Sequence, residues 1–220
     1  MYCRHCFRKR LVGLVDSEVV VDWDRVAAYL RAHREVTNVL LSGGDPLILA
    51  TDHLEAILRR LAGIRHLRYV RIGSRIPVVL PSRILDDNSL HGAFKAFASG
   101  GKQLYVTTQF NHPCELTSAS IQSVKRLQED GVIVNNQTVL LKWVNDCPSV
   151  MAELQTTLAH AGVIPYYVFQ CRPVTAVMDE FQVPLHDACQ LIGEARKQLD
   201  GLSKRFRFVM SHLTGKIEIW

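Results

Sequence analysis

Two cysteines close to the amino terminus form the first pattern in the chain that could support chemistry. Cys3 and Cys6 make a Cys-x-x-Cys pair, whose thiolates can converge on one metal ion or iron–sulfur cluster. Zinc ribbons, redox motifs and iron–sulfur sites all use this spacing. A structural zinc site would normally add a second pair, but the other cysteines of the sequence stand singly, at positions 114, 147, 171 and 189. The pair therefore predicts a metal or cluster site without choosing between them.

A glycine-rich element at residues 40–47, Leu-Leu-Ser-Gly-Gly-Asp-Pro-Leu, is the second candidate for chemistry. Gly43 and Gly44 have no Cβ atom, so the backbone can approach a ligand closely there. Ser42 and Asp45 add polar groups on either side. A plain tight turn would explain these residues equally well in isolation. The element is thus a candidate binding loop whose meaning depends on its neighbours.

Alternating strand-like and helix-like segments must position these residues. Short apolar runs alternate with amphipathic segments at a spacing of about thirty residues, which favours parallel βαβ units. The expected strands are residues 38–41, 67–72, 103–108, 132–138, 164–170 and 205–210. The expected helices are residues 23–34, 52–61, 88–98, 118–129, 150–161 and 186–199, with Thr117 and Ser149 as N-caps and Gly131 and Gly162 at C-termini.

Polar clusters follow nearly every expected strand and favour a barrel over an open sheet. They lie at residues 42–45, 73–75, 109–112, 135–137 and 170–172. In a (βα) barrel, the carboxyl ends of the strands converge on one mouth, where loops build the active site. Turn formation could explain one or two of these clusters, but not all five. We therefore expect the site at this mouth.

Composition indicates one α/β domain spanning residues 1–220. The 48% of apolar side chains suffices for one core, and no apolar run of about 18 residues or signal-peptide pattern is present. Six scattered cysteines fit a reducing compartment, so we expect a cytoplasmic protein and no membrane partner. The net charge of +5 comes without a stripe of interleaved aromatic residues, and we favour solvated basic faces over nucleic-acid binding.

The cysteine pair and the glycine-rich element, taken with five further motifs, resemble the radical S-adenosylmethionine (SAM) enzymes, and more narrowly the lysine 2,3-aminomutase family. The further motifs lie at residues 70–81, 110–113, 136–146, 165–171 and 211–219, in the family's order. The resemblance covers residues 2–219. It implies a partial (βα)6 TIM-like barrel with a radical SAM core.

The resemblance also implies a cluster and a SAM pocket. Cys3 and Cys6 match the second and third cysteines of the family's Cys-x-x-x-Cys-x-x-Cys motif, which holds a [4Fe–4S] cluster and leaves one iron for SAM. The first cysteine would lie before Met1, so we expect a chain truncated within the motif, either a fragment or an inactive form. The residues implied on the SAM side are Ser42, Gly43, Gly44, Asp45, Ser74, Arg75 and Gln137.

Lys216, after Gly215, is implied as the lysine that holds pyridoxal 5′-phosphate (PLP), although an exposed edge-strand lysine would be the commoner case. Arg8 would engage the substrate carboxylate, unless it belongs to a solvated basic run. Arg172 and Val209 stand where lysine aminomutases have the two aspartates that recognise lysine. A cation facing the lysine ammonium would cost on the order of several kcal/mol. We therefore predict against free lysine and favour an acidic side chain, such as glutamate.

The implied activity is a radical SAM, PLP-dependent 2,3-aminomutase, which moves an amino group from C2 to C3 of an amino acid. Its partners would be a small amino acid and an electron donor such as flavodoxin or ferredoxin, with a homo-oligomer left open. Two alternatives remain: an aminomutase acting on a lysine of a protein such as an elongation factor, and a zinc- and nucleic-acid-binding module or inactive fragment.

Overall fold

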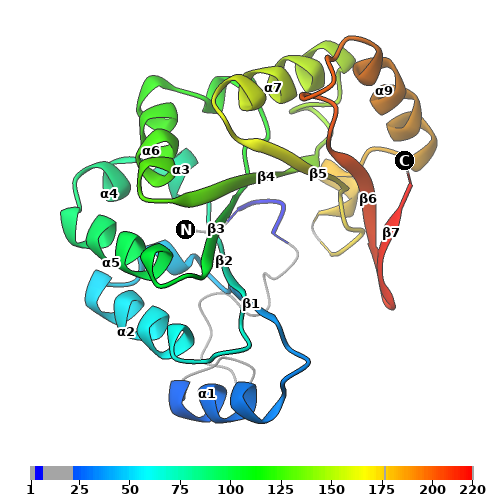
Figure 1. The fold of residues 1–220 in the computed structure, drawn as a ribbon. Coiled ribbons are helices and arrows are strands. Elements are labelled where there is room, and N and C mark those ends of the chain that lie inside the picture. The colour runs from blue at the N-terminus through cyan, green and yellow to red at the C-terminus, as the bar shows by residue number, and fades with distance from the viewer. Residues whose placement is uncertain (1–2, 7–21, 176, 220) are drawn as a thin grey trace.

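The strands of the chain form one curled sheet (Figure 1). The computed structural model describes residues 3–6, 22–175 and 177–219. Within them the strands are β1 (Asn38–Leu41), β2 (Tyr69–Gly73), β3 (Gln103–Thr108), β4 (Val132–Leu140), β5 (Ile164–Gln170), β6 (Arg207–His212) and β7 (Gly215–Glu218). They follow one another in the sheet in chain order. Neighbours from β1 to β6 pair in parallel, and β7 pairs antiparallel with β6.

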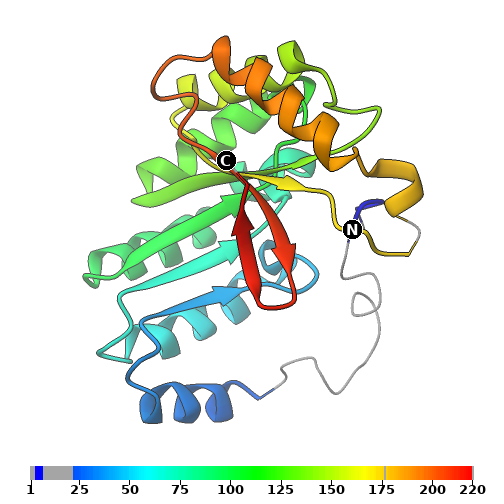
Figure 2. The same ribbon diagram turned by 90° about the vertical axis from the view of Figure 1, so that its right-hand side faces the viewer.

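Helices connect the parallel strands and cover the convex face of the sheet (Figure 2). The long helices are α1 (Trp23–Ala32), α2 (Thr51–Ala62), α5 (Asn88–Ser99), α6 (Ser118–Glu129), α7 (Pro148–His160) and α9 (Leu185–Lys197). Short helical turns follow several strands, namely η1 (Pro46–Ile48), α3 (Ile76–Val79), α4 (Ser82–Leu85), η2 (Pro113–Glu115) and α8 (Met178–Phe181). Among the described residues, no helix is long and apolar enough to cross a membrane.

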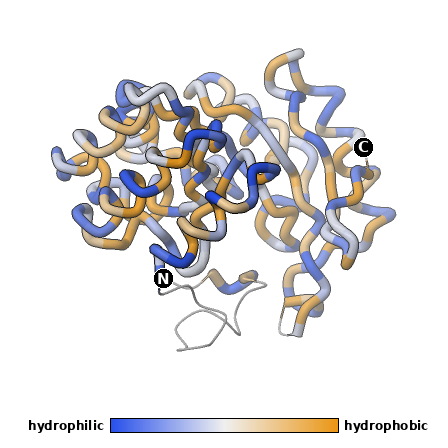
Figure 3. Tube along the Cα trace, turned by 60° about the horizontal axis from the view of Figure 1, so that its bottom comes forward, coloured by the Kyte–Doolittle hydropathy of each residue, from blue (hydrophilic) through white to orange (hydrophobic). Residues whose placement is uncertain are grey.

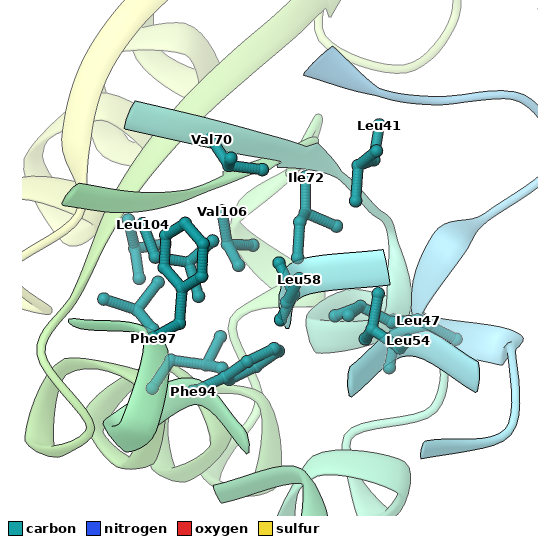
Figure 4. Packing of buried hydrophobic residues seen from close by; sticks show 14 of the residues in the cluster. Leu41, Leu47, Leu54, Leu58, Val70, Ile72, Phe94, Phe97, Leu104 and Val106 are labelled. Atoms are coloured by element: carbon teal, nitrogen blue, oxygen red, sulfur yellow. The ribbon is translucent and has the colours of Figure 1, made fainter. Parts of the chain in front are cut away.

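The largest core lies between the sheet and the helices α2 and α5. The buried residues of α2 recur at the spacing of an amphipathic helix, which the sequence predicted: Leu54, Ile57, Leu58 and Leu61. Figure 4 shows side chains of this core facing those of β2 and β3. Figure 3 shows that apolar and polar stretches alternate along the chain.

Capping residues explain where several helices begin and end. Thr117 accepts a hydrogen bond from the backbone N–H of Ser120, as expected for an N-cap. Gly131 and Gly162 have φ values of 81° and 74°, the left-handed conformation predicted for them. The prediction for Ser149 was wrong, because α7 begins one residue earlier. A proline occupies its first position, where the missing N–H removes no helical hydrogen bond.

The six-stranded partial barrel expected from the sequence is confirmed, with one addition. The family motif at residues 211–219 contains the end of β6, a turn and β7, which pairs antiparallel with β6. Gly215, with φ of 138°, begins the returning strand. The turn of the hairpin was not predicted. It contains Leu213, an apolar residue of a type common in strands, whose side chain is 97% exposed in the structure.

Leu54→Ala should lower the free energy of unfolding by about 2–5 kcal/mol, because Leu54 is fully buried and the substitution leaves a cavity. Urea denaturation measures the effect. Leu213→Ala is the matched control and should change stability by less than about 0.5 kcal/mol, since its side chain is almost fully exposed. Equal effects of the two substitutions would contradict the packing described above.

Candidate active site

The turn containing Cys3 and Cys6 lies at the carboxyl ends of the strands (Figure 2). The backbone N–H of Cys6 donates to the carbonyl of Cys3 over 3.0 Å, which brings the two cysteines into one turn. Gln109, directly after β3, donates to a ring nitrogen of His5 over 3.4 Å. The ring of Phe181 in α8 lies 5.4 Å from the guanidinium of Arg4. The turn therefore sits at the predicted barrel mouth.

Arg75 joins this turn to two other loops of the mouth. Its Nη1 donates to the Sγ of Cys3 over 3.3 Å, and its Nη2 donates to Oε1 of Glu115 over 2.7 Å. Its backbone N–H donates to Oδ2 of Asp45 over 2.6 Å. The Arg75 and Glu115 side chains are only 17% and 26% exposed, so this ion pair is shielded from much of the solvent. The structure thus brings together Cys3, Asp45 and Arg75, three of the residues singled out in the sequence.

The glycine-rich loop after β1 leaves open space beside its backbone. A Cβ atom added at Gly43 or Gly44 would meet nothing within 4 Å among the described residues. Gly43 has a φ of 153°, which favours glycine. Asp45 caps the next turn by accepting from the N–H of Leu47 over 3.1 Å. Packing against the described residues therefore does not require glycine at Gly44, and a ligand contact at this loop stays a prediction.

Ser74 is buried beside Arg75, and its hydroxyl accepts from the backbone N–H of Ile76 over 3.0 Å. This bond shapes the start of α3. A ligand contact at Ser74 stays a prediction.

The polar cluster at residues 135–137 was expected at a strand end but lies inside β4, which continues to residue 140. Asn136 is buried on the helix side of the strand. It accepts from the N–H of Phe110 over 2.7 Å and donates to the same residue's carbonyl over 3.1 Å, which fixes the loop after β3. The side chain of Gln137, the next residue, lies on the opposite face of the sheet and is only partly buried.

Lys216 lies on the face of the sheet that also carries Gln137. Gln137 is in register with Tyr167 of β5, so the two side chains share a face. The Lys216 amine lies 4.4 Å from the centroid of the Tyr167 ring and 5.4 Å from that of Phe169. Burial of this amine against the rings lowers the pKa of Lys216, although the residue as a whole is exposed. Arg71 and Arg207 lower the pKa further by charge repulsion.

The residues predicted at the substrate side are placed as follows. Arg172 is partly buried in the loop after β5, and the buried Val209 lies in β6, in register with Phe169. The neighbouring Cys171 is buried, which raises the pKa of its thiol to about 11 and keeps it protonated at neutral pH. Arg8 lies outside the described residues. The substrate roles of Arg8, Arg172 and Val209 stay predictions.

Glu115 is the residue of this site that the sequence analysis missed. A local pattern could have indicated it, because His112 and Glu115 are spaced as a capping box around a proline. His112 caps η2, accepting from the N–H of Cys114 over 3.2 Å. The pattern predicts a turn but not the partner of Glu115, since Arg75 is forty residues away in the chain.

The predicted metal ligands Cys3 and Cys6 lie in one turn, and metal binding there stays a prediction. Across residues 3–6, 22–175 and 177–219, no group of three or more His, Cys, Asp or Glu side chains could hold a metal ion. Two thiols in one turn fit part of the donor set of an iron–sulfur cluster, and the described residues offer no tetrahedral zinc site.

Solved structures with the same architecture define the class of fold. Streptococcus suis SuiB bound to S-adenosylmethionine superposes with a TM-score of 0.67 at 15% identity, covering 96% of this chain and 47% of that one. A radical SAM methyltransferase from Sphaerobacter thermophilus gives a TM-score of 0.56 at 16% identity, over 85% of this chain and 56% of that one. The chain therefore has the partial TIM-barrel fold of radical SAM enzymes.

Sequence relatives identify the family to which the chain belongs within this class. A protein of Aquifex aeolicus provisionally named as an L-lysine 2,3-aminomutase is 48% identical over all 220 residues, and L-lysine 2,3-aminomutase of Methanococcus maripaludis is 42% identical over 78% of the chain. Glutamate 2,3-aminomutase of Clostridioides difficile is 35% identical over 92% of it. The chain belongs to the lysine 2,3-aminomutase family of radical SAM enzymes, as the sequence motifs predicted.

The chain spans only part of these relatives, covering 59%, 38% and 47% of their respective lengths. No protein-family model matches it. The family assignment disfavours the alternative of a zinc- and nucleic-acid-binding module.

Lys216 should lose its proton at lower pH than an exposed lysine. Its rate of acylation, followed by mass spectrometry without added PLP, should rise at lower pH than that of Lys197, which is exposed on α9. Because the folded-state pKa lies below the usual 10.5, stability should also increase as pH rises through the interval between these values.

Arg207→Gln should move the Lys216 profile to higher pH, since it removes a repelling positive charge. Identical profiles for Lys216 and Lys197 would contradict the placement of the amine over the rings.

Proposed function

We propose that this chain forms the catalytic barrel of a radical SAM, PLP-dependent 2,3-aminomutase that moves an amino group from C2 to C3 of an amino acid. The observation that carries the proposal is the Cys3–Cys6 turn, held at the carboxyl ends of the strands by the Arg75 contact to Cys3 Sγ. The chain belongs to a family whose named members include lysine and glutamate 2,3-aminomutases. As the chain spans part of its relatives, the activity is proposed for the whole protein.

In this proposal, Cys3 and Cys6 provide two thiolates of a [4Fe–4S] cluster. The open space beside Gly43 and Gly44 supports a SAM ligand at the loop after β1, where the backbone can approach it closely. The remaining proposed SAM contacts are Ser42, Asp45, Ser74, Arg75 and Gln137. When bound, the reduced cluster and SAM supply a 5′-deoxyadenosyl radical. The chain's own contribution is to fix this ligand's orientation and to exclude water.

Lys216 is the proposed attachment site of PLP. A lowered pKa suits this role, because a larger fraction of the amine is neutral and nucleophilic at neutral pH. When bound, PLP supplies a ring over which an unpaired electron can spread. The aromatic rings of Tyr167 and Phe169 bound the amine on one side. Since Gln137 shares this face through Tyr167, the two halves of the site can meet on the concave side of the sheet.

Charge at the substrate side favours an amino acid with an acidic side chain. Arg172 places a positive charge, and Val209 an apolar group, where a lysine-specific site would need carboxylates. A glutamate side chain would gain an ion pair with Arg172, whereas a lysine ammonium would face repulsion. Arg8 is the proposed partner of the substrate α-carboxylate. An electron donor such as flavodoxin or ferredoxin, and a cytoplasmic location, complete the proposal.

Cys6→Ser in the whole protein should abolish most of the iron and sulfide bound on anaerobic reconstitution, because one cluster thiolate is lost. Iron and sulfide analysis and the electron paramagnetic resonance (EPR) signal of the reduced protein measure this. Cys189→Ser, on α9, is the matched control and should retain wild-type iron. A wild-type protein without iron–sulfur colour or SAM cleavage would refute the proposed function.

The reconstituted enzyme should convert glutamate in preference to lysine. Arg172→Asp should lower kcat/KM for glutamate by about tenfold or more, equivalent to about 1.4 kcal/mol, since it replaces an attractive charge by a repulsive one. Arg172→Lys keeps the charge and should lose less activity. Chromatographic detection of the 3-amino product measures turnover. Turnover of lysine but not of glutamate by the wild-type enzyme would end the substrate assignment.

A further inference from the structure

We propose that Glu115 is a positioning residue that holds the guanidinium of Arg75 against the thiolate of Cys3 and thereby raises the reduction potential of the cluster. Because a [4Fe–4S] cluster at Cys3 and Cys6 is assumed, this assignment rests on the proposed function. It adds a role for a residue that contacts neither the cysteines nor the glycine-rich loop in the described hydrogen bonds.

Glu115 uses its two carboxylate oxygens differently. Oε2 accepts from the backbone N–H groups of Asn111 over 2.6 Å and His112 over 3.2 Å. These two donors fix the carboxylate in the capping box of η2. Oε1 is thereby directed to Nη2 of Arg75, 2.7 Å away. Two backbone donors thus hold the carboxylate in addition to its contact with Arg75.

Arg75 needs such an anchor to keep its donor at the sulfur. Its side chain is long and would lose considerable rotamer entropy if ordered by a single weak N–H···S contact. It is also 17% exposed, so water compensates little of its charge. Glu115 supplies both the compensating charge and the second point of attachment. The remaining side-chain donor, Nε, is buried and has no acceptor within the part of the chain described, so it does not compete for the guanidinium's orientation.

The expected effect on the cluster follows from charge. Reduction of a cluster adds one negative charge, and hydrogen bonds to the ligand sulfurs stabilise that charge and raise the potential. Arg75 Nη1 donates to Cys3 Sγ over 3.3 Å. Removing the Arg75 donor should therefore lower the potential. Releasing Arg75 by removing the Glu115 charge should lower it in the same direction, because the guanidinium is then free to leave the sulfur.

A purely structural role for Glu115 predicts something different. Glu115 also caps η2, so its loss could reduce stability without affecting the cluster. The reduction potential of the cluster distinguishes the two roles, because a residue that only caps η2 would leave this potential unchanged. The two roles also differ in whether the effect of Glu115 on the potential requires Arg75.

The experiment compares midpoint potentials of the reconstituted whole protein, without SAM, by redox titration followed by EPR. The variants are Glu115→Gln, Arg75→Met and their combination, and Glu194→Gln is the matched control, an exposed glutamate paired with Lys197 on α9. Both single variants should have lower potentials than wild type. The double variant should have a potential no lower than that of Arg75→Met alone, because Glu115 supports the donor only through Arg75, and loss of its own negative charge cannot lower the potential. The control should be unchanged.

An unchanged or raised potential in Glu115→Gln, or an equal further drop when it is added to Arg75→Met, would overturn the assignment. If Glu115→Gln does not assemble a cluster, Glu115→Asp retains the charge but withdraws it by one methylene, and should still lower the potential. An unchanged potential in that variant would overturn the assignment equally. A wild-type protein that binds no cluster would instead refute the proposed function.

Discussion

Parallel pairing of β1 through β6 is the constraint on which the site depends. Because these strands run in one direction, the loops that follow them all leave the sheet at the same edge. Residues from loops far apart in the chain can therefore meet there, as Cys3, Asp45 and Arg75 do. Apolar burial on the other side, against α2 and α5 in one cluster and against α7 and α9 in another, holds the strands in this arrangement.

The two halves of the proposed site differ in their electrostatics. At the strand ends, the positive guanidinium of Arg75 donates a hydrogen bond to the sulfur of Cys3. On the concave face, the Lys216 amine is partly buried against aromatic rings and lies near other cations, which lowers its pKa. The proposed cluster half therefore has a cation beside sulfur, and the proposed PLP half has an amine with a lowered pKa. Both environments arise from residues that local sequence patterns place on different strands.

The sequence predicted the elements well because their periodicity is local. The buried positions of α2, the cap at Thr117 and the left-handed glycines depend on neighbours a few residues away. The failures share a cause in tertiary or positional context. Asn136 looked like a mouth residue, but the extra length of β4 turns it toward the helices, where it fixes the loop after β3. Glu115 was missed because its partner lies forty residues earlier.

The sheet begins at β1 and ends at β7, and no ladder joins these two strands among the described residues. In a closed barrel, the hydrogen-bond circuit itself fixes the radius. Here the distance between the Cys3–Cys6 turn and Lys216 depends on how the outer helices pack. Substitutions deep in that helical layer could therefore retune the separation of two reactive groups without touching either of them.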